Sequence, residues 1–334
     1  MLHVTNGSIA VSRLHDLGMS GRIVPWDDVL HEGPVRAGLS DEELRRERAG
    51  FLAISWGDVE GIERSLCARD ELVASAAVDD DEIVLWFEHD LYDQLQLVQV
   101  TDRLARLGDA RRARVSAILP DDYLTAQSDE QLQAWFDRRM PVQAHQWQAA
   151  QAAWSAFCAQ DPTALNGFAH PGAWPALRTA LHRHLQQFPS VGTGLSRTEA
   201  QTLAAVADGP LSLRATFRAS NHEVEDAIFM GDSTWWFHIR LLLAGPHPLL
   251  AVVGEPPEDF HHPEWWRDDD AAPMLTLTET GADVLAGAAD HIALNGINRW
   301  LGGVHLVAQG PGDGRSSAAP FWRWDEARAT LHRT

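Results

Sequence analysis

A short apolar run at residues 82–87 (EIVLWF) lies between an acidic turn and the polar tripeptide EHD at residues 88–90. A continuous apolar run of this length is typical of a strand that is buried on both faces of a parallel sheet. Such a sheet requires helices on both of its faces, so this run limits the possible folds more than any other feature of the chain.

Strands and helices alternate around this run. The segments with strand-like spacing are residues 2–5, 22–26, 82–87 and 114–119, and those with helical spacing are residues 9–17, 41–56, 59–76 and 91–107. Ser40 and Glu43 have the spacing of a capping box at the start of the 41–56 helix. We therefore predict an α/β domain at residues 1–125, with an open, mostly parallel sheet and flanking helices.

The rest of the chain has a different pattern. Residues 126–190 are predicted to be a helical segment, and residues 311–334 a C-terminal tail. Between them, residues 191–310 contain expected helices at 196–207, 222–229 and 234–243, strands at 249–253 and 274–278 around a polar loop at 254–273, and a closing helix at 281–286. Three helices followed by a two-stranded wing predict a winged-helix-like domain.

The composition excludes several chemistries. All 27 basic residues are arginines, so the chain has no lysine for a P-loop, a pyridoxal Schiff base or a protein-kinase strand. The formal net charge is -20, and residues 195–334 carry 19 acidic residues against 10 arginines. Because nucleic-acid binding depends on neutralising phosphates, this balance argues against a nucleic-acid partner.

The chain lacks the marks of export or membrane insertion. No apolar run approaches the roughly 20 residues of a membrane-spanning helix, and residues 1–6 lack the basic and apolar regions of a signal peptide. Cys67 and Cys158 lie far apart and form no CxxC pair. We expect a cytoplasmic protein with two free thiols and no membrane partner.

The polar residues after the 82–87 strand form the first candidate site, because ligands of open α/β sheets bind beyond the carboxyl ends of the strands. The residues expected there are His89, Asp90, Asp93 and Gln94. His89 is a candidate general base or metal ligand, and Asp90 and Asp93 are candidate orienting or ligating carboxylates. The alternatives are that the aspartates only cap the following helix and that His89 is only a hydrogen-bonded structural residue.

Two further polar segments follow predicted strands. They are Asn6-Gly7-Ser8 and residues 26–34, which include Asp28, His31 and Glu32. We expect His31 and Glu32 to act with His89 and the aspartates as catalytic residues. The residues expected to bind a ligand are Asn6, Gly7, Ser8 and Asp28. The alternative is that both segments are plain turns. His31-Glu32 does not start an HExxH motif, because Val35 stands at the last position.

Residues 295–305 (NGINRWLGGVH) form a further polar cluster, which we call the 295–305 cluster. Arg299 is a candidate clamp for an anionic ligand, and His305 is a candidate to close that site. Gly302 and Gly303 allow close approach of another backbone. The alternative for this cluster is a tight structural joint.

Residues 27–34 (DDVLHEGP) and 85–97 (LWFEHDLYDQLQL) resemble the hallmark segments of a bacterial family known as domain of unknown function 1835. The resemblance covers roughly residues 1–125, and the part ending in RWLGGVH resembles the C-terminal part of some longer members. The family is one of unknown function, so the resemblance implies no activity for this chain. The resemblance therefore implies only which residues matter: Asn6, Asp28, His31, Glu32, His89, Asp90, Asp93 and Gln94.

These observations favour a small-molecule enzyme, a hydrolase or group transferase with a His/Asp/Glu site at the strand tips. A polar substrate, such as one bearing phosphate or a nucleotide, suits the fold by analogy. The alternative is a ligand-sensing regulatory protein whose winged-helix half docks DNA or protein. DNA is the weaker choice, because the expected recognition helix at 234–243 carries the aromatic run WWF, which suits burial.

Overall fold

The computed structural model describes residues 1–76, 82–254, 266, 272–310 and 321–334. Its contacts divide the chain into two compact units. The first unit comprises Met1–His184 with Trp300–Val304, and the second comprises Leu185–Arg299 with His305–Thr334. Within the part of the chain that the structure describes, no helix is both long and apolar enough to cross a membrane.

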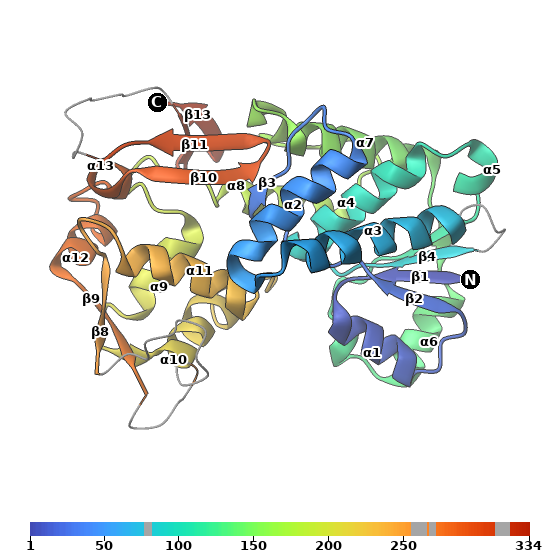
Figure 1. Cartoon of the computed structure of the whole chain (residues 1–334), viewed down its shortest axis with the longest axis horizontal. Helices are drawn as coiled ribbons and strands as arrows, with labels where there is room; N and C mark the ends of the chain where they lie inside the picture. Colours follow the sequence, from blue (N-terminus) through green and yellow to red (C-terminus); the bar gives the residue numbers. More distant parts are fainter. Residues whose placement is uncertain (77–81, 255–265, 267–271, 311–320) are drawn as a thin grey trace. The chain divides into compact units, whose positions relative to one another are not determined.

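The first unit is built on a five-stranded sheet in the order β2-β1-β4-β5-β6 (Figure 1). The strands are β1 (Leu2–Thr5), β2 (Arg22–Pro25), β4 (Ile83–Trp86), β5 (Val115–Ile118) and β6 (Met140–Pro141). The first four are parallel and β6 is antiparallel. The predicted open, mostly parallel sheet is confirmed. The prediction of helix throughout residues 126–190 is wrong at β6. This edge strand has two residues and ends in a proline, and it is too short to show a periodic pattern in the sequence.

Helices cover both faces of this sheet, as Figure 1 shows. On one face, α1 (Ser8–Asp16) and α6 (Asp129–Asp137) bury an apolar core made of Ala10, Leu14, Val84, Trp86, Ile118, Leu124 and Leu132. On the other face lie α2 (Asp41–Trp56), α3 (Val59–Ala76) and α4 (Leu91–Ala105). The capping box expected at Ser40 and Glu43 is present.

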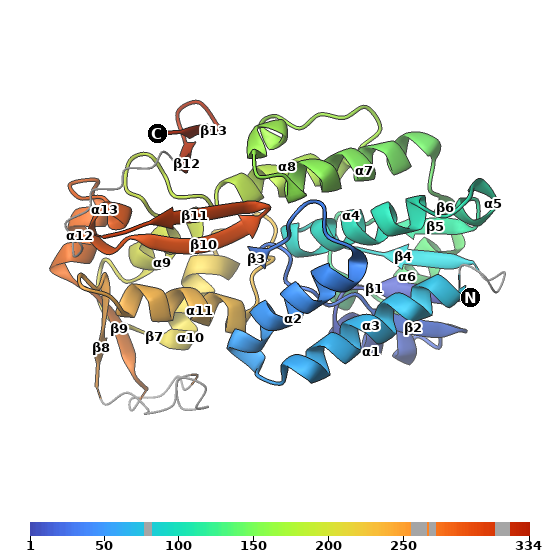
Figure 2. The ribbon, with the colours of Figure 1, turned by 45° about the horizontal axis from the view of Figure 1, so that its top comes forward.

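Further elements complete the first unit. They are β3 (Gly33–Pro34), α5 (Asp109–Arg112), the short helices η1 (Leu124–Ala126) and η2 (Pro162–Leu165), α7 (Ala144–Cys158) and α8 (Pro175–Leu185). Helix α7 runs beside α4, as Figure 2 shows. Gly303 donates its N–H to the Phe157 carbonyl at 3.0 Å, and a Cβ on Gly302 would lie 2.5 Å from the same oxygen. Gly302 and Gly303 of the 295–305 cluster therefore make the expected close backbone approach, at the end of α7.

The chain order creates a topological switch point in the sheet. From β1 the chain passes through α1 to β2 on one side, and it then crosses back to β4 and β5 on the other side of β1. The direction of winding thus reverses between β1 and β4, where Thr5 and Trp86 are paired. At such a switch point the flanking loops diverge and leave room for a ligand beyond the carboxyl ends of the two strands.

The second unit begins with helices. They are α9 (Arg197–Ala205), α10 (Leu213–Phe217), the π-helical turn η3 (Arg218–His222) and α11 (Asp232–Leu243). The expected helix at 222–229 is wrong: the helical residues are Leu213–His222, because the Ser212 hydroxyl caps this earlier segment by accepting from Ala215 N–H.

The strands of the second unit form small sheets. Strands β7 (Leu211–Ser212), β9 (Met274–Leu277) and β8 (Leu250–Val253) form an antiparallel sheet in that order. Helices α12 (Glu279–Leu285) and α13 (His291–Asn295) follow, then β10 (Ile297–Gly302), β11 (Val304–Ala308), β12 (Trp322–Asp325) and β13 (Thr330–Arg333). The polar loop predicted at residues 254–273 lies largely outside the described residues.

Candidate functional site

Three carboxyl groups gather where β4 ends and α4 begins. Glu88 follows the strand, Asp90 is the N-cap of α4 and Asp93 lies in its first turn. One oxygen from each of the three lies within 4.8 Å of the others. Glu88 is 6% exposed, Asp90 4% and Asp93 0%, so these charges have little contact with water. We call these three residues the acidic triad.

Local hydrogen bonds fix the acidic triad. The Asp90 side chain accepts from Asp93 N–H at 3.0 Å, which is an ordinary N-cap bond. Asp93 Oδ1 in turn accepts from Glu88 N–H at 2.6 Å, which closes the turn between strand and helix. The helix-capping role that was the alternative for this aspartate is therefore confirmed for Asp90.

The neighbouring strand β1 contributes Asn6 to the same place. Its Nδ2 donates to Asp93 Oδ2 at 2.5 Å and lies 3.3 Å from Glu88 Oε2. Gly7 is the N-cap of α1 with φ 37°, and Ser8 is the exposed first residue of that helix. Leu124 N–H donates to Glu88 Oε1 at 2.6 Å. The structure thus joins Asn6 to the acidic triad, whereas Gly7 and Ser8 start the helix.

Burial shifts the pKa values of all three acids upward. Loss of water is the main cause in each case: it raises the pKa of Asp90 to about 7, and it raises the pKa of Glu88. The pKa of Asp93 lies well above its usual range, because burial is reinforced by the charges of Asp90 and Glu88. No cationic side chain among the described residues forms an ion pair with the acidic triad. The group therefore holds protons or requires a bound cation at neutral pH.

Two more polar side chains adjoin the acidic triad. Gln94 is 1% exposed and its Nε2 donates to the Glu88 carbonyl at 2.7 Å. Its Oε1 is buried and makes no hydrogen bond with the described part of the chain. His89 is half-buried with its ring centroid 5.0 Å from that of Tyr123, and its Nδ1 likewise has no hydrogen-bond partner among the described residues. An amide oxygen and an imidazole nitrogen without hydrogen-bond partners among the described residues thus belong to residues that adjoin the acidic triad in sequence.

The hallmark segment at residues 27–34 packs against α4, but its Asp28 carboxylate has a charge partner elsewhere. The His31 ring lies 6.0 Å from the Tyr92 ring, and Gln96 donates to the Asp28 carbonyl at 3.2 Å. Asp28 is paired with Arg48, whose Nη2 lies 2.7 Å from Asp28 Oδ1, and both side chains are 1% exposed. Arg48 also donates to the Glu32 carbonyl at 2.7 Å. Asp28 therefore anchors this loop through an internal ion pair.

The remaining predicted site residues lie on β10 and β11. Arg299 Nη1 lies 3.9 Å from Glu199 Oε1 and lines a cavity of the second unit. His305 is exposed, and its Nε2 lies 2.8 Å from Asn298 Oδ1. It does not contribute to the lining of that cavity.

Sequence reasoning missed two functional side chains. Glu88 was grouped with its neighbours but not chosen, although it is the first polar residue after the strand. Arg48 was not singled out in the sequence. Its signal is its spacing, since Leu44 and Leu52 lie four residues to either side and all three are buried on one helix face.

No protein-family model matches the chain, and no curated protein matches it. The resemblance to the family of unknown function stays a prediction, and the functional argument rests on the geometry of the site.

Proposed function

We propose that the first unit is a divalent-cation-dependent enzyme that performs hydrolysis or group transfer on a small, phosphate-bearing substrate. The observation that carries this proposal is the acidic triad: three buried carboxyl groups with raised pKa values and no cationic partner among the described residues. Its place at the switch point between β1 and β4 supports it independently.

The donor set favours a hard cation such as Mg²⁺ or Mn²⁺. All the candidate ligands are oxygens, from the acidic triad and from Gln94, and hard cations prefer carboxylate and amide oxygens. One oxygen from each carboxyl lies within 4.8 Å of the others, so the three could converge on a single cation. A bound cation would neutralise charges that burial otherwise disfavours.

Each residue then has a defined part. The acidic triad would hold the cation, which supplies Lewis-acid polarisation of a phosphoryl oxygen when bound. Asn6 would hold Glu88 and Asp93 in position through its amide group. His89, half-buried beside the acidic triad, would take the proton of the attacking water or hydroxyl and later pass one to the leaving group.

A panel of phosphomonoesters, phosphodiesters and nucleotides tests this function with the full-length protein. We expect turnover of at least one class with Mg²⁺ or Mn²⁺ and none with a chelator. His89→Ala should lower turnover by about 10²–10⁴-fold while leaving Mn²⁺ affinity unchanged. His15→Ala, an exposed histidine of the same unit, is the matched control. Equal turnover of the His89 variant and the parent would remove His89 from the chemistry.

A second candidate function rests on the topology of the second unit. The order α9, β7, α10, α11, β8, β9 with the sheet β7-β9-β8 is that expected of a winged helix. We propose on this basis a regulatory role as the alternative, in which this unit docks a protein surface. The expected recognition helix α11 buries Trp235, Trp236 and Ile239, which disfavours duplex DNA as the partner. Fluorescence anisotropy with mixed-sequence duplexes tests this, and sub-micromolar, steeply salt-dependent binding would favour the DNA alternative.

A further inference from the structure

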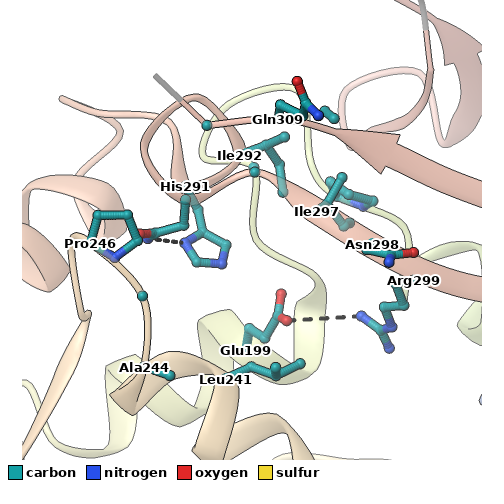
Figure 3. Close-up of a pocket in the computed structure, with 17 residues that line it drawn as sticks. Glu199, Leu241, Ala244, Pro246, His291, Ile292, Ile297, Asn298, Arg299 and Gln309 are labelled. Carbon is teal, nitrogen blue, oxygen red and sulfur yellow. Dashed lines mark hydrogen bonds and ion pairs between the residues drawn. The ribbon is translucent and has the colours of Figure 1, made fainter. Parts of the chain in front are cut away.

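A cavity of about 580 Å³ lies entirely within the second unit (Figure 3). Its walls come from α9, the end of α11, α13 and the strands β10 and β11. Small-molecule sites commonly have volumes of roughly 300–1,000 Å³. This cavity is far from the acidic triad in sequence and uses none of the residues assigned to it.

Two opposite charges face each other across the cavity. Glu199 Oε1 and Arg299 Nη1 are 3.9 Å apart, which is too long for a hydrogen bond. Their side chains are 10% and 9% exposed, so water screens them weakly. Figure 3 shows both side chains at the cavity, each pointing toward the other.

The carboxylate of Glu199 is fixed and ionised. It closes the capping box of α9 by accepting from Ser196 N–H through Oε2 at 2.7 Å, which leaves Oε1 toward Arg299. Burial alone would raise the pKa of Glu199. The neighbouring His238 ring and the charge of Arg299 outweigh that effect and hold the pKa of Glu199 well below the usual range.

A chain of hydrogen bonds sets the tautomer of His291 on another wall of the cavity. The Asn295 oxygen accepts from His247 N–H at 3.0 Å, because a backbone amide can only donate. The Asn295 amide nitrogen must then donate to His291 Nδ1, which lies 3.2 Å away. A neutral His291 therefore carries its proton on Nε2, and this nitrogen acts as a donor.

The rest of the lining contains the polar residues Asn298 and Gln309 and a set of apolar residues. The apolar residues include Leu241, Ala244, Pro246, Ile292 and Ile297. Gly296 has φ 73°, and a Cβ there would lie 2.6 Å from the Ala308 carbonyl, so only glycine lets the two chain segments of this wall meet. The cavity thus combines an acceptor, two donors and an apolar surface.

We propose that this cavity binds a free α-amino acid with an apolar side chain. The α-ammonium group would bind Glu199, and the α-carboxylate would bind Arg299 and His291 Nε2. A zwitterion preserves the charge balance of the buried pair, whereas an anion alone is repelled by Glu199 and a cation alone by Arg299. The two charged ends of an amino acid are close enough to lie along an ion pair of 3.9 Å.

Binding of amino acids to the full-length protein tests this proposal without any variant. Thermal-shift measurements with the twenty free L-amino acids select a ligand, and titration calorimetry measures its affinity. For leucine, the matched probes are N-acetyl-leucine, which lacks the ammonium charge, and isoamylamine, which lacks the carboxylate. We expect 1:1 binding of an apolar amino acid and at least about tenfold weaker binding of each analogue. No binding of any free amino acid at millimolar concentration would overturn the proposal.

Two variants locate the site. Glu199→Gln keeps an acceptor for the capping box but removes the charge, and Arg299→Lys keeps the charge but loses the planar fork. Each should weaken binding by about tenfold or more. Arg218→Gln removes a partner from the exposed Arg218–Glu223 pair of the same unit and should leave the affinity unchanged. Undiminished binding to a folded Glu199→Gln protein would place the amino acid elsewhere.

Discussion

The acidic triad of the first unit and Glu199 of the second are buried alike, yet their pKa values shift in opposite directions. Glu199 faces Arg299 and His238, and its pKa is lowered. Burial is also the largest effect on Asp90, but this carboxyl has only other carboxyls as charged neighbours, and its pKa rises to about 7. A buried carboxylate with a fixed cationic partner has its charge compensated within the protein. A buried carboxyl group without such a partner requires a proton or a metal ion.

The Asp28–Arg48 pair tests the first half of this comparison and carries the largest expected effect. Arg48→Met leaves Asp28 buried and uncompensated, so we expect a loss of about 3–5 kcal/mol in the free energy of unfolding. Arg46→Met is the matched control on the same helix, because Arg46 pairs with Glu42 at the surface. Its loss should be below about 1 kcal/mol in urea unfolding. Similar losses for the two variants would contradict the distinction between buried and exposed pairs.

The pH dependence of stability tests the second half. A carboxyl whose folded pKa is raised binds its proton more tightly in the folded state, so the stability it contributes is lost as pH rises through that pKa. For Asp90 the window runs from about pH 4 to about pH 7, with a loss of about 2–4 kcal/mol. Glu199 has a lowered pKa, so the stability that it contributes is lost only as pH falls below the usual pKa of a glutamate.

Hydrogen exchange of the α4 amides, corrected for the intrinsic effect of pH, measures this local free energy. In the presence of a chelator, the local free energy of opening of α4 should fall as pH rises from about 4 to about 7. Saturating Mg²⁺ should abolish this fall. An α4 stability that does not change with pH in chelator would show that the acidic triad is not strained by its own charge.

Asp90→Asn is expected to give a smaller effect of opposite sign. Asparagine caps a helix as well as aspartate does, so the bond to Asp93 N–H is kept while one buried charge is removed. Without metal at about pH 8, the variant should be more stable than the parent by roughly 1–2 kcal/mol in urea unfolding. A destabilised variant would mean that the Asp90 charge already has a favourable partner.

Much of the first unit could be predicted from the sequence, because most of its helices and strands have a clear signal in the local sequence. The apolar run at β4, the capping box at Ser40 and the polar residues after the strands all give the right element in nearly the right place. The strand ends then predict where polar side chains gather, which is how Asn6, Asp90 and Asp93 were found.

The rest depends on contacts between distant parts of the chain. Arg48 meets Asp28 only because α2 packs over the loop before it, and Leu124 N–H reaches Glu88 from a separate turn. Strands β10 and β11 were missed because Gly302 and Gly303 suggested a joint. The two strands are neighbours in one sheet, and the end of β10 pairs in addition with the distant residues Gly33 and Pro34. The local spacing of apolar and polar residues does not indicate which distant residues will be in contact.

Calorimetric titration of Mn²⁺ into the full-length protein at about pH 7.5, in two buffers of different ionisation enthalpy, tests the central claim most directly. The account predicts one ion per chain and net release of protons, because the metal displaces protons that burial holds on the acidic triad. Asp90→Asn should bind at least about tenfold more weakly, and Glu42→Gln, at an exposed surface pair, should bind as the parent does. No heat of binding, or equal binding by Asp90→Asn, would contradict the account.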